Sequence, residues 1–103
     1  MVKHIVMWKL KEFADGASKQ ENARILRSRL ESLQREIEEV KSLEVGVNFN
    51  PTEVAYDVVL VAEFEDKQAL SRYQNHPEHQ RLITELLDKI RLEKKVVDYE
   101  LTD

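Results

Sequence analysis

The sequence predicts one α+β domain in which four strands and two helical blocks follow one another in the order β-α-β-β-α-β. Apolar residues recur every two positions in four stretches, which is typical of strands, and every three or four positions in two others, which is typical of amphipathic helices. With 103 residues and 42% apolar content, the chain has the size of a single domain, residues 1–103, and is too short for two independent cores.

The first predicted strand covers residues 2–10. Its alternation places Val6 and Trp8 on one side and Ile5 and Met7 on the other. Both sides carry large apolar groups, so neither is suited to contact with water. We therefore expect both faces of this strand to be covered.

The first helix is predicted to begin near Ser18. Ser18 and Glu21 have the spacing of a capping box, in which each side chain binds a backbone N–H at the helix start. Downstream, apolar positions recur at spacings of three and four: Leu26, Leu30, Leu33, Ile37 and Val40. This pattern predicts an amphipathic helix whose charged residues form a solvated face.

Two further strands are expected at residues 42–49 and 54–64, separated by a turn at Asn50-Pro51. The second of them is rich in β-branched residues and apolar on both alternating sets, which predicts a central strand. Asp66 can then cap a short helix that carries Tyr73.

Residues 75–77, Asn-His-Pro, interrupt that helix. The residue before a proline avoids helical dihedral angles, whereas proline suits the first turn of a helix. A new helix should therefore start there, and we interpret His76 as a residue that caps or buttresses the break. A stripe at residues 82–90 continues this helix, and residues 92–101 alternate as a last strand.

This order matches the ferredoxin-like motif, in which helices cover one face of a four-stranded antiparallel sheet. The opposite face is then bare, and we place Ile5, Met7, Val58 and Leu60 on it. An exposed apolar area of this size usually marks an interface. We expect two such sheets to pair in a homodimer, forming a dimeric α/β barrel.

Several classes of function are disfavoured by composition. The chain has no cysteine, a net charge of −4 and only two glycines. It therefore lacks thiolate chemistry, a concentrated basic patch for nucleic acid and a glycine-rich phosphate loop. No stretch reaches membrane-spanning length, and His4, His76 and His79 lack metal-ligand spacing. We expect a cytoplasmic protein without metal, cofactor, nucleic-acid or membrane partner.

Three segments resemble the stress-responsive dimeric α/β-barrel (Dabb) family: Val-Lys-His-Ile-Val-Met-Trp-Lys-Leu-Lys at residues 2–11, the pair 44–46 and 57–60, and above all Tyr-Gln-Asn-His-Pro-Glu-His at residues 73–79. The resemblance implies a dimer whose sheets pack face to face, with a pocket in each subunit between sheet and helices. Some relatives bind a hard cation through backbone carbonyls, which would fall around Gln34, Ile37 and Val40.

The family includes a plant polyketide cyclase, and the resemblance places its catalytic tyrosine and histidine at Tyr73 and His79. His4 matches a further pocket histidine. Val58 stands where this cyclase carries a histidine on its third strand. Because of this departure, the resemblance does not define the substrate or the reaction of this chain.

Tyr73 and His79 suit proton abstraction next to a carbonyl. A neutral histidine can accept a proton near pH 7, and a tyrosine hydroxyl can donate a hydrogen bond to a forming oxyanion. No cofactor is needed, and a small apolar or phenolic ligand would fit walls supplied by Val6, Trp8, Leu30 and Leu82. Helical spacing does not decide whether the two residues face each other. Tyr73 can equally fill core volume, and His4 is more often a satisfied buried histidine.

Three hypotheses of function follow. The first is a homodimer with a small-molecule pocket, acting as a cofactor-free lyase, cyclase or isomerase or as a carrier. The second is a structural or stress-protective dimer whose pocket is packed shut, and the third is a cofactor-free oxygenase. Pocket volume separates the first two, and oxygen consumption with phenolic substrates separates the third.

Overall fold

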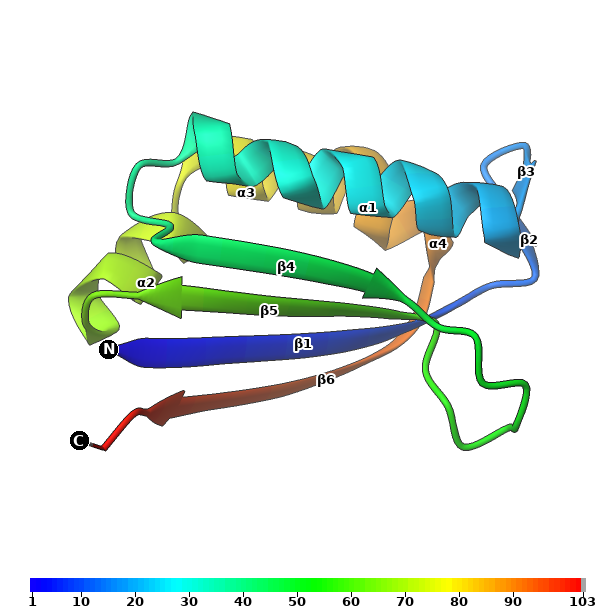
Figure 1. Ribbon diagram of the computed structural model, residues 1–103. Helices are drawn as coiled ribbons and strands as arrows, with labels where there is room; N and C mark the ends of the chain where they lie inside the picture. The colour runs from blue at the N-terminus through cyan, green and yellow to red at the C-terminus, as the bar shows by residue number, and fades with distance from the viewer. Residues whose placement is uncertain (103) are drawn as a thin grey trace.

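The computed structural model describes residues 1–102. Its main sheet consists of β1 (Val2–Leu10), β4 (Ser42–Val47), β5 (Val58–Phe64) and β6 (Arg91–Glu100), in the order β4-β5-β1-β6. All neighbouring pairs are antiparallel. Figure 1 shows the helices on one face of this sheet and no element on the other. The predicted α+β, ferredoxin-like fold is confirmed.

Helix α1 (Lys19–Glu36) begins where the capping box predicts. The Ser18 hydroxyl accepts a hydrogen bond from the Glu21 N–H at 3.2 Å. The helix ends earlier than its apolar spacing predicts, because Ile37 adopts an extended conformation. Ile37 and Val40 are nevertheless buried. The apolar pattern in this region therefore reports burial of the following turn rather than continued helix.

A short hairpin precedes α1 and was not predicted as strand. It joins β2 (Phe13–Ala14) to β3 (Ala17–Ser18) through Asp15 and Gly16, whose φ angles are 52° and 77°. An Asp-Gly pair with positive φ at both positions is the usual two-residue hairpin turn. Strands of two residues are too short to produce a recognisable alternation. The buried Asn22 side chain donates to a carbonyl of this hairpin at 2.9 Å and ties it to α1.

The middle strands are shorter than predicted because residues 48–57 form a loop. Within it, the Asn50 side chain accepts hydrogen bonds from the backbone and the hydroxyl of Thr52. Such local bonds compete with strand pairing. Phe49 and Val54, which we expected in strands, are consequently 97% and 85% exposed.

The second helical block is interrupted where Pro77 predicts. Helix α2 (Lys67–Gln74) is capped by Asp66, which accepts the Ala69 N–H at 2.8 Å. Helix α3 (Pro77–Leu82) follows, and the His76 ring accepts the Glu78 N–H at 3.1 Å. The interpretation of His76 as a cap is confirmed. The chain then continues through a π-helical turn, η1 (Ile83–Leu87), and α4 (Asp88–Ile90).

The strand register corrects the assignment of the two sheet faces. Val6 pairs with Leu60 and Trp8 with Val58, and all four are buried in the core between sheet and helices. Val58 and Leu60 therefore do not belong to the bare face. Because β5 is apolar on both alternating sets, the sequence could not choose between its faces. The bare sheet face, as the register defines it, carries the apolar residues Ile5, Met7, Val59, Val61, Val97 and Tyr99.

Candidate functional site

The break at Pro77 brings the side chains of Tyr73 and His79 together. Tyr73 lies in α2 and His79 in α3, and their ring centroids are 4.7 Å apart in an edge-on arrangement. Tyr73 also packs against the Phe64 ring at 4.8 Å. Spacing in the sequence left the relative position of the pair open, and the structure places them in direct contact.

A cavity of about 80 Å³ lies beside this pair, between the sheet and the helices. The seven residues predicted for the site all line it: His4, Val6, Trp8, Leu30, Tyr73, His79 and Leu82. Seven others line it that the sequence analysis did not assign to the cavity: Leu60, which it placed on the bare sheet face, and Gln74, Ile83, Leu87, Arg91, Lys94 and Val96. Ile83 and Leu87 are placed there by the π-helical turn and Arg91, Lys94 and Val96 by β6. No local sequence signal indicates either.

Three buried polar atoms of the lining residues have no hydrogen-bond partner among residues 1–102. They are the Tyr73 hydroxyl, His79 Nδ1 and Trp8 Nε1. A buried polar group without a partner costs about 1–3 kcal/mol, and most such groups in proteins are satisfied by protein or by water. Three such groups on residues that line one cavity make this cavity the candidate functional site.

Burial sets the protonation state of the Tyr73–His79 pair. It raises the pKa of the Tyr73 hydroxyl well above its usual range, so this group remains a donor. It also lowers the pKa of His79 to about 4, while hydrogen bonding to the Gln74 backbone acts in the opposite direction. The charges of His4, Lys94 and His76 add to the lowering of the His79 pKa. At pH 7 the His79 ring is therefore neutral and keeps a lone pair that can accept a proton.

His4 is a buried histidine with a partner. It is 4% exposed, and its Nδ1 pairs with a carboxylate oxygen of Asp98, which lies opposite it on β6. Its ring is 6.2 Å from that of Tyr73. His4 thus lines the cavity while its own hydrogen-bonding need is met. Asp98 was not foreseen, because only the β1–β6 register brings the two residues together.

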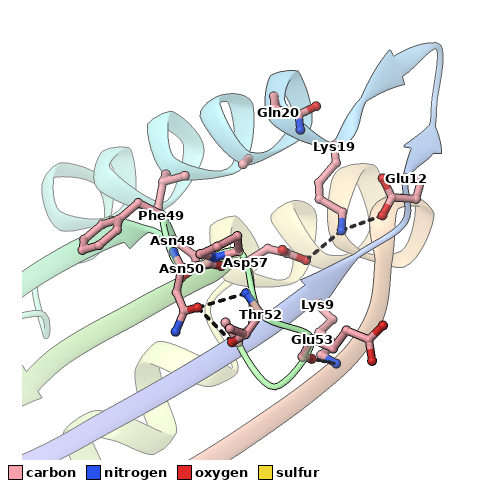
Figure 2. Close-up of a pocket in the computed structure, with 14 residues that line it drawn as sticks. Lys9, Glu12, Lys19, Gln20, Asn48, Phe49, Asn50, Thr52, Glu53 and Asp57 are labelled. Atoms are coloured by element: carbon pink, nitrogen blue, oxygen red, sulfur yellow. Dashed lines mark hydrogen bonds and ion pairs between the residues drawn. The ribbon is translucent and has the colours of Figure 1, made fainter.

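A larger and more open hollow of about 750 Å³ lies between α1 and the 48–57 loop (Figure 2). Its charged groups largely pair with one another. Lys19 Nζ lies 2.9 Å from a Glu12 oxygen and 3.7 Å from an Asp57 oxygen, and Lys9 Nζ donates to a carbonyl of the loop at 3.0 Å. Because unpartnered buried groups indicate a site better than volume does, we regard the smaller cavity as the candidate site.

Residues 1–102 contain neither a helix long and apolar enough to cross a membrane nor a group of three His, Asp or Glu side chains that could hold a metal ion. His76, the third histidine, does not line the cavity. His4 and His79, in contrast, both line it.

Comparison with known proteins gives one family. The model of the stress responsive A/B barrel domain (Dabb) matches residues 2–101. An uncharacterized protein of Streptomyces coelicolor is 33% identical over 82 residues, covering 78% of this chain and 80% of that protein.

Two solved structures show the likeness in three dimensions. A dimeric protein of unknown function with a ferredoxin-like fold from Bacteroides fragilis is 31% identical, with a TM-score of 0.80, and the match covers 97% of this chain and 95% of that one. A hydroxynitrile lyase from Passiflora edulis is 16% identical at a TM-score of 0.80, covering 99% and 94%. At 16% identity, the similarity to the lyase shows only that the two proteins share a fold. Since the family model spans almost the whole chain, this protein belongs to the stress responsive A/B barrel domain (Dabb) family.

Proposed function

We propose that the protein is a homodimer whose cavity binds a small apolar or phenolic molecule and catalyses proton transfer next to a carbonyl without a cofactor. The contact between Tyr73 and His79 supports this most directly, since each contributes an unpartnered polar atom beside the same cavity. The Tyr73 hydroxyl stays protonated and can donate a hydrogen bond, and the neutral His79 ring can accept a proton. A reaction that removes a proton while charge develops on an oxygen needs both.

In the proposed reaction, His79 accepts a proton from a carbon next to a carbonyl group. The electrons of the broken C–H bond move onto the carbonyl oxygen, and the Tyr73 hydroxyl donates a hydrogen bond to the resulting enolate. Return of the proton to a different carbon completes an isomerisation. Attack of the enolate carbon on a second carbonyl of the same molecule, with the proton passed to the new alkoxide, completes a cyclisation. Atoms and electrons balance without an oxidant or reductant.

The surroundings of the pair favour such a step. Val6, Leu30 and Leu82 are each at most 3% exposed and line the cavity beside it. An apolar lining that excludes water lowers the local dielectric constant, which strengthens the hydrogen bond from Tyr73 to a developing negative charge. His79 with a pKa of about 4 is a weak base, so stabilisation of the oxyanion must supply much of the rate acceleration.

The proposed homodimer is supported by the bare sheet face and by the dimeric relative from Bacteroides fragilis. Met7, Val97 and Tyr99 on this face are 39%, 52% and 42% exposed in the single chain. A contiguous apolar surface of this kind is usually covered by a partner.

Hydrogen–deuterium exchange at carbon tests the proposed chemistry before a natural substrate is known. The rate at which ethyl acetoacetate exchanges its C2 protons in D₂O can be followed by NMR, and the native protein should accelerate it above the buffer rate. His79→Gln should remove the acceleration, because it removes the proton acceptor. Tyr73→Phe should lower it by about 10²–10³-fold, the usual effect of losing one oxyanion donor.

Matched controls are His76→Gln and Tyr56→Phe, which remove the same groups outside the cavity. Both should keep the native exchange rate. An exchange rate that is equal in buffer, native protein and His79→Gln would refute the proposal.

The small volume favours a second candidate, a structural dimer with a closed pocket. A cavity of about 80 Å³ is well below the roughly 300–1,000 Å³ of common ligand pockets. This function predicts no accelerated exchange and no ligand-dependent change at Trp8, the single tryptophan of the chain, which lines the cavity.

A further inference from the structure

The charged residues at the cavity are all cationic. Arg91 and Lys94 line it from β6, and none of the lining residues is an aspartate or glutamate. Arg91 reaches the Asp88 carboxylate only at 3.8 Å, and Lys94 has no carboxylate within 4 Å among residues 1–102. The cavity lining therefore carries two positive charges, whereas the Asp98 carboxylate, which lies outside the lining, is engaged by His4.

Lys94 lines the cavity from the edge strand β6, although the residue is exposed in the single chain. It pairs with Trp8 across β1 and β6, which places both on the same face of the sheet. Its charge also contributes to lowering the pKa of His79. The positive field of Lys94 thus reaches the groups proposed to carry out the chemistry.

Two of the three unpartnered atoms are hydrogen-bond donors, whereas His79 Nδ1 belongs to the neutral ring that we propose as the proton acceptor. Trp8 Nε1–H can only donate a hydrogen bond, and the Tyr73 hydroxyl, held protonated, is free to donate one. A ligand that satisfies these donors must bring acceptor oxygens. A metal cation would be repelled by Arg91 and Lys94, and a purely apolar ligand would leave both donors unpaired.

Building on the proposed function, we infer that the cavity selects a small carboxylate, whose charged end meets Lys94 and Arg91 while its apolar part lies against Val6, Leu30 and Leu82. Guanidinium and ammonium groups bind carboxylates by charge-assisted hydrogen bonds, which are stronger than neutral ones. The preferred substrate class is then an enolisable carboxylic acid, such as a keto acid, over a neutral ketone or ester of similar shape.

The single tryptophan makes this testable by NMR. The indole N–H of Trp8 gives one resonance that reports directly on the cavity. We would titrate the native protein with butyrate, with butyramide, which has the same shape without the charge, and with phenol. Butyrate should bind about tenfold or more tightly than butyramide, the usual margin of one hydrogen bond to a charged group.

Lys94→Met should remove most of the preference for butyrate. The matched control is Lys89→Met, which loses one positive charge from an exposed position in α4 that does not line the cavity. This control should keep the preference. As a second readout, bound butyrate should raise the pKa of His79 above about 4, since a nearby anion favours the protonated ring. Butyramide should raise the His79 pKa less.

Each outcome decides between the two proposals. Equal affinities for butyrate and butyramide, or a preference that survives in an Arg91→Gln/Lys94→Met double variant, would overturn the inference. If phenol still shifts the Trp8 resonance in that case, the proposed small-molecule cavity stands without it. If none of the three probes shifts the resonance, the carboxylate inference fails together with the ligand-binding function.

Discussion

On the helix-covered face of the sheet, side chains of β1 and β5 are buried, yet the Trp8, Tyr73 and His79 side chains around the cavity have polar atoms without partners. On the opposite face the same strands present apolar side chains, and Met7 is 39% exposed. One face therefore buries polar atoms that need a partner, and the other exposes apolar surface that needs cover.

The exposed apolar surface of one face and the unpartnered polar atoms of the other need different kinds of partner. Exposed apolar area is relieved by any surface of matching shape, at about 25 cal/mol per Å² removed from water, so a second copy of the chain suffices. A buried donor or acceptor is relieved only by a polar atom at hydrogen-bond distance. The bare face is therefore suited to association with a second copy of the chain, and the cavity is suited to binding a defined small molecule.

The largest effect is expected from a charge on the bare face. Met7→Glu would bury an unpaired carboxylate in the proposed interface, which typically costs several kcal/mol. We expect the dimer to weaken by about 100-fold or more, while the helix-covered core and the circular dichroism spectrum stay native. Sedimentation velocity at micromolar concentration measures this.

Ile25→Glu is the control for Met7→Glu. Ile25 lies on α1 and is 44% exposed, so this variant adds the same charge at a similarly exposed apolar position away from the sheet. It should remain dimeric. A native protein that sediments as a monomer, or a Met7→Glu variant that dimerises like the native protein, would show that the bare face is not the interface.

A moderate effect is expected from pH, and it should come from the cavity. The unfolded chain binds a proton at His79 near pH 6.5, but the folded chain does so only near pH 4. Between these values the unfolded state holds more protons, so His79 reduces stability as pH falls from about 6.5 to about 4. Urea unfolding across this range should show a smaller loss of stability in His79→Gln than in the native protein.

His76→Gln controls for the removal of a histidine, because His76 caps α3 outside the cavity. Because the charge of His76 contributes to the lowered pKa of His79, this variant should keep most but not all of the native pH dependence between about 6.5 and 4. If His79→Gln loses as much stability as the native protein in this window, then His79 is solvated when folded and the cavity is not dry.

The comparison also shows which features could be predicted from the sequence. Ser18 as a cap and the break at Pro77 follow from contacts within a few residues, and both were predicted. The placement of Val58 and Leu60 was wrong because the two alternating sets of β5 are equally apolar. Only the pairing with β1 decides between them. The His4–Asp98 pair and the position of Lys94 beside the cavity depend on the pairing of β6 with β1, two strands that lie far apart in the sequence. Non-local pairing leaves no local signal for such features.

The smallest effect on stability, and the sharpest separation of stability from chemistry, is expected from Tyr73→Phe. The ring packs against Phe64 and His79, with centroids 4.8 and 4.7 Å away, and these contacts persist in the variant. The hydroxyl has no partner among residues 1–102, so its removal breaks no hydrogen bond and relieves a buried unsatisfied group. Stability should therefore stay the same or rise by up to about 1 kcal/mol, although the exchange activity falls.

Urea unfolding at pH 7 measures this change, and Tyr56→Phe serves as its control. The Tyr56 hydroxyl makes an exposed contact 3.4 Å from Glu93, so its loss should leave stability unchanged within the error of the measurement. If Tyr73→Phe instead destabilises the free protein by more than about 1 kcal/mol, its hydroxyl is already hydrogen-bonded without ligand, most simply to ordered water in the cavity. Tyr73 would then belong to a hydrated core. The proposal that Tyr73 stabilises an oxyanion would lose its main support, the unpartnered hydroxyl.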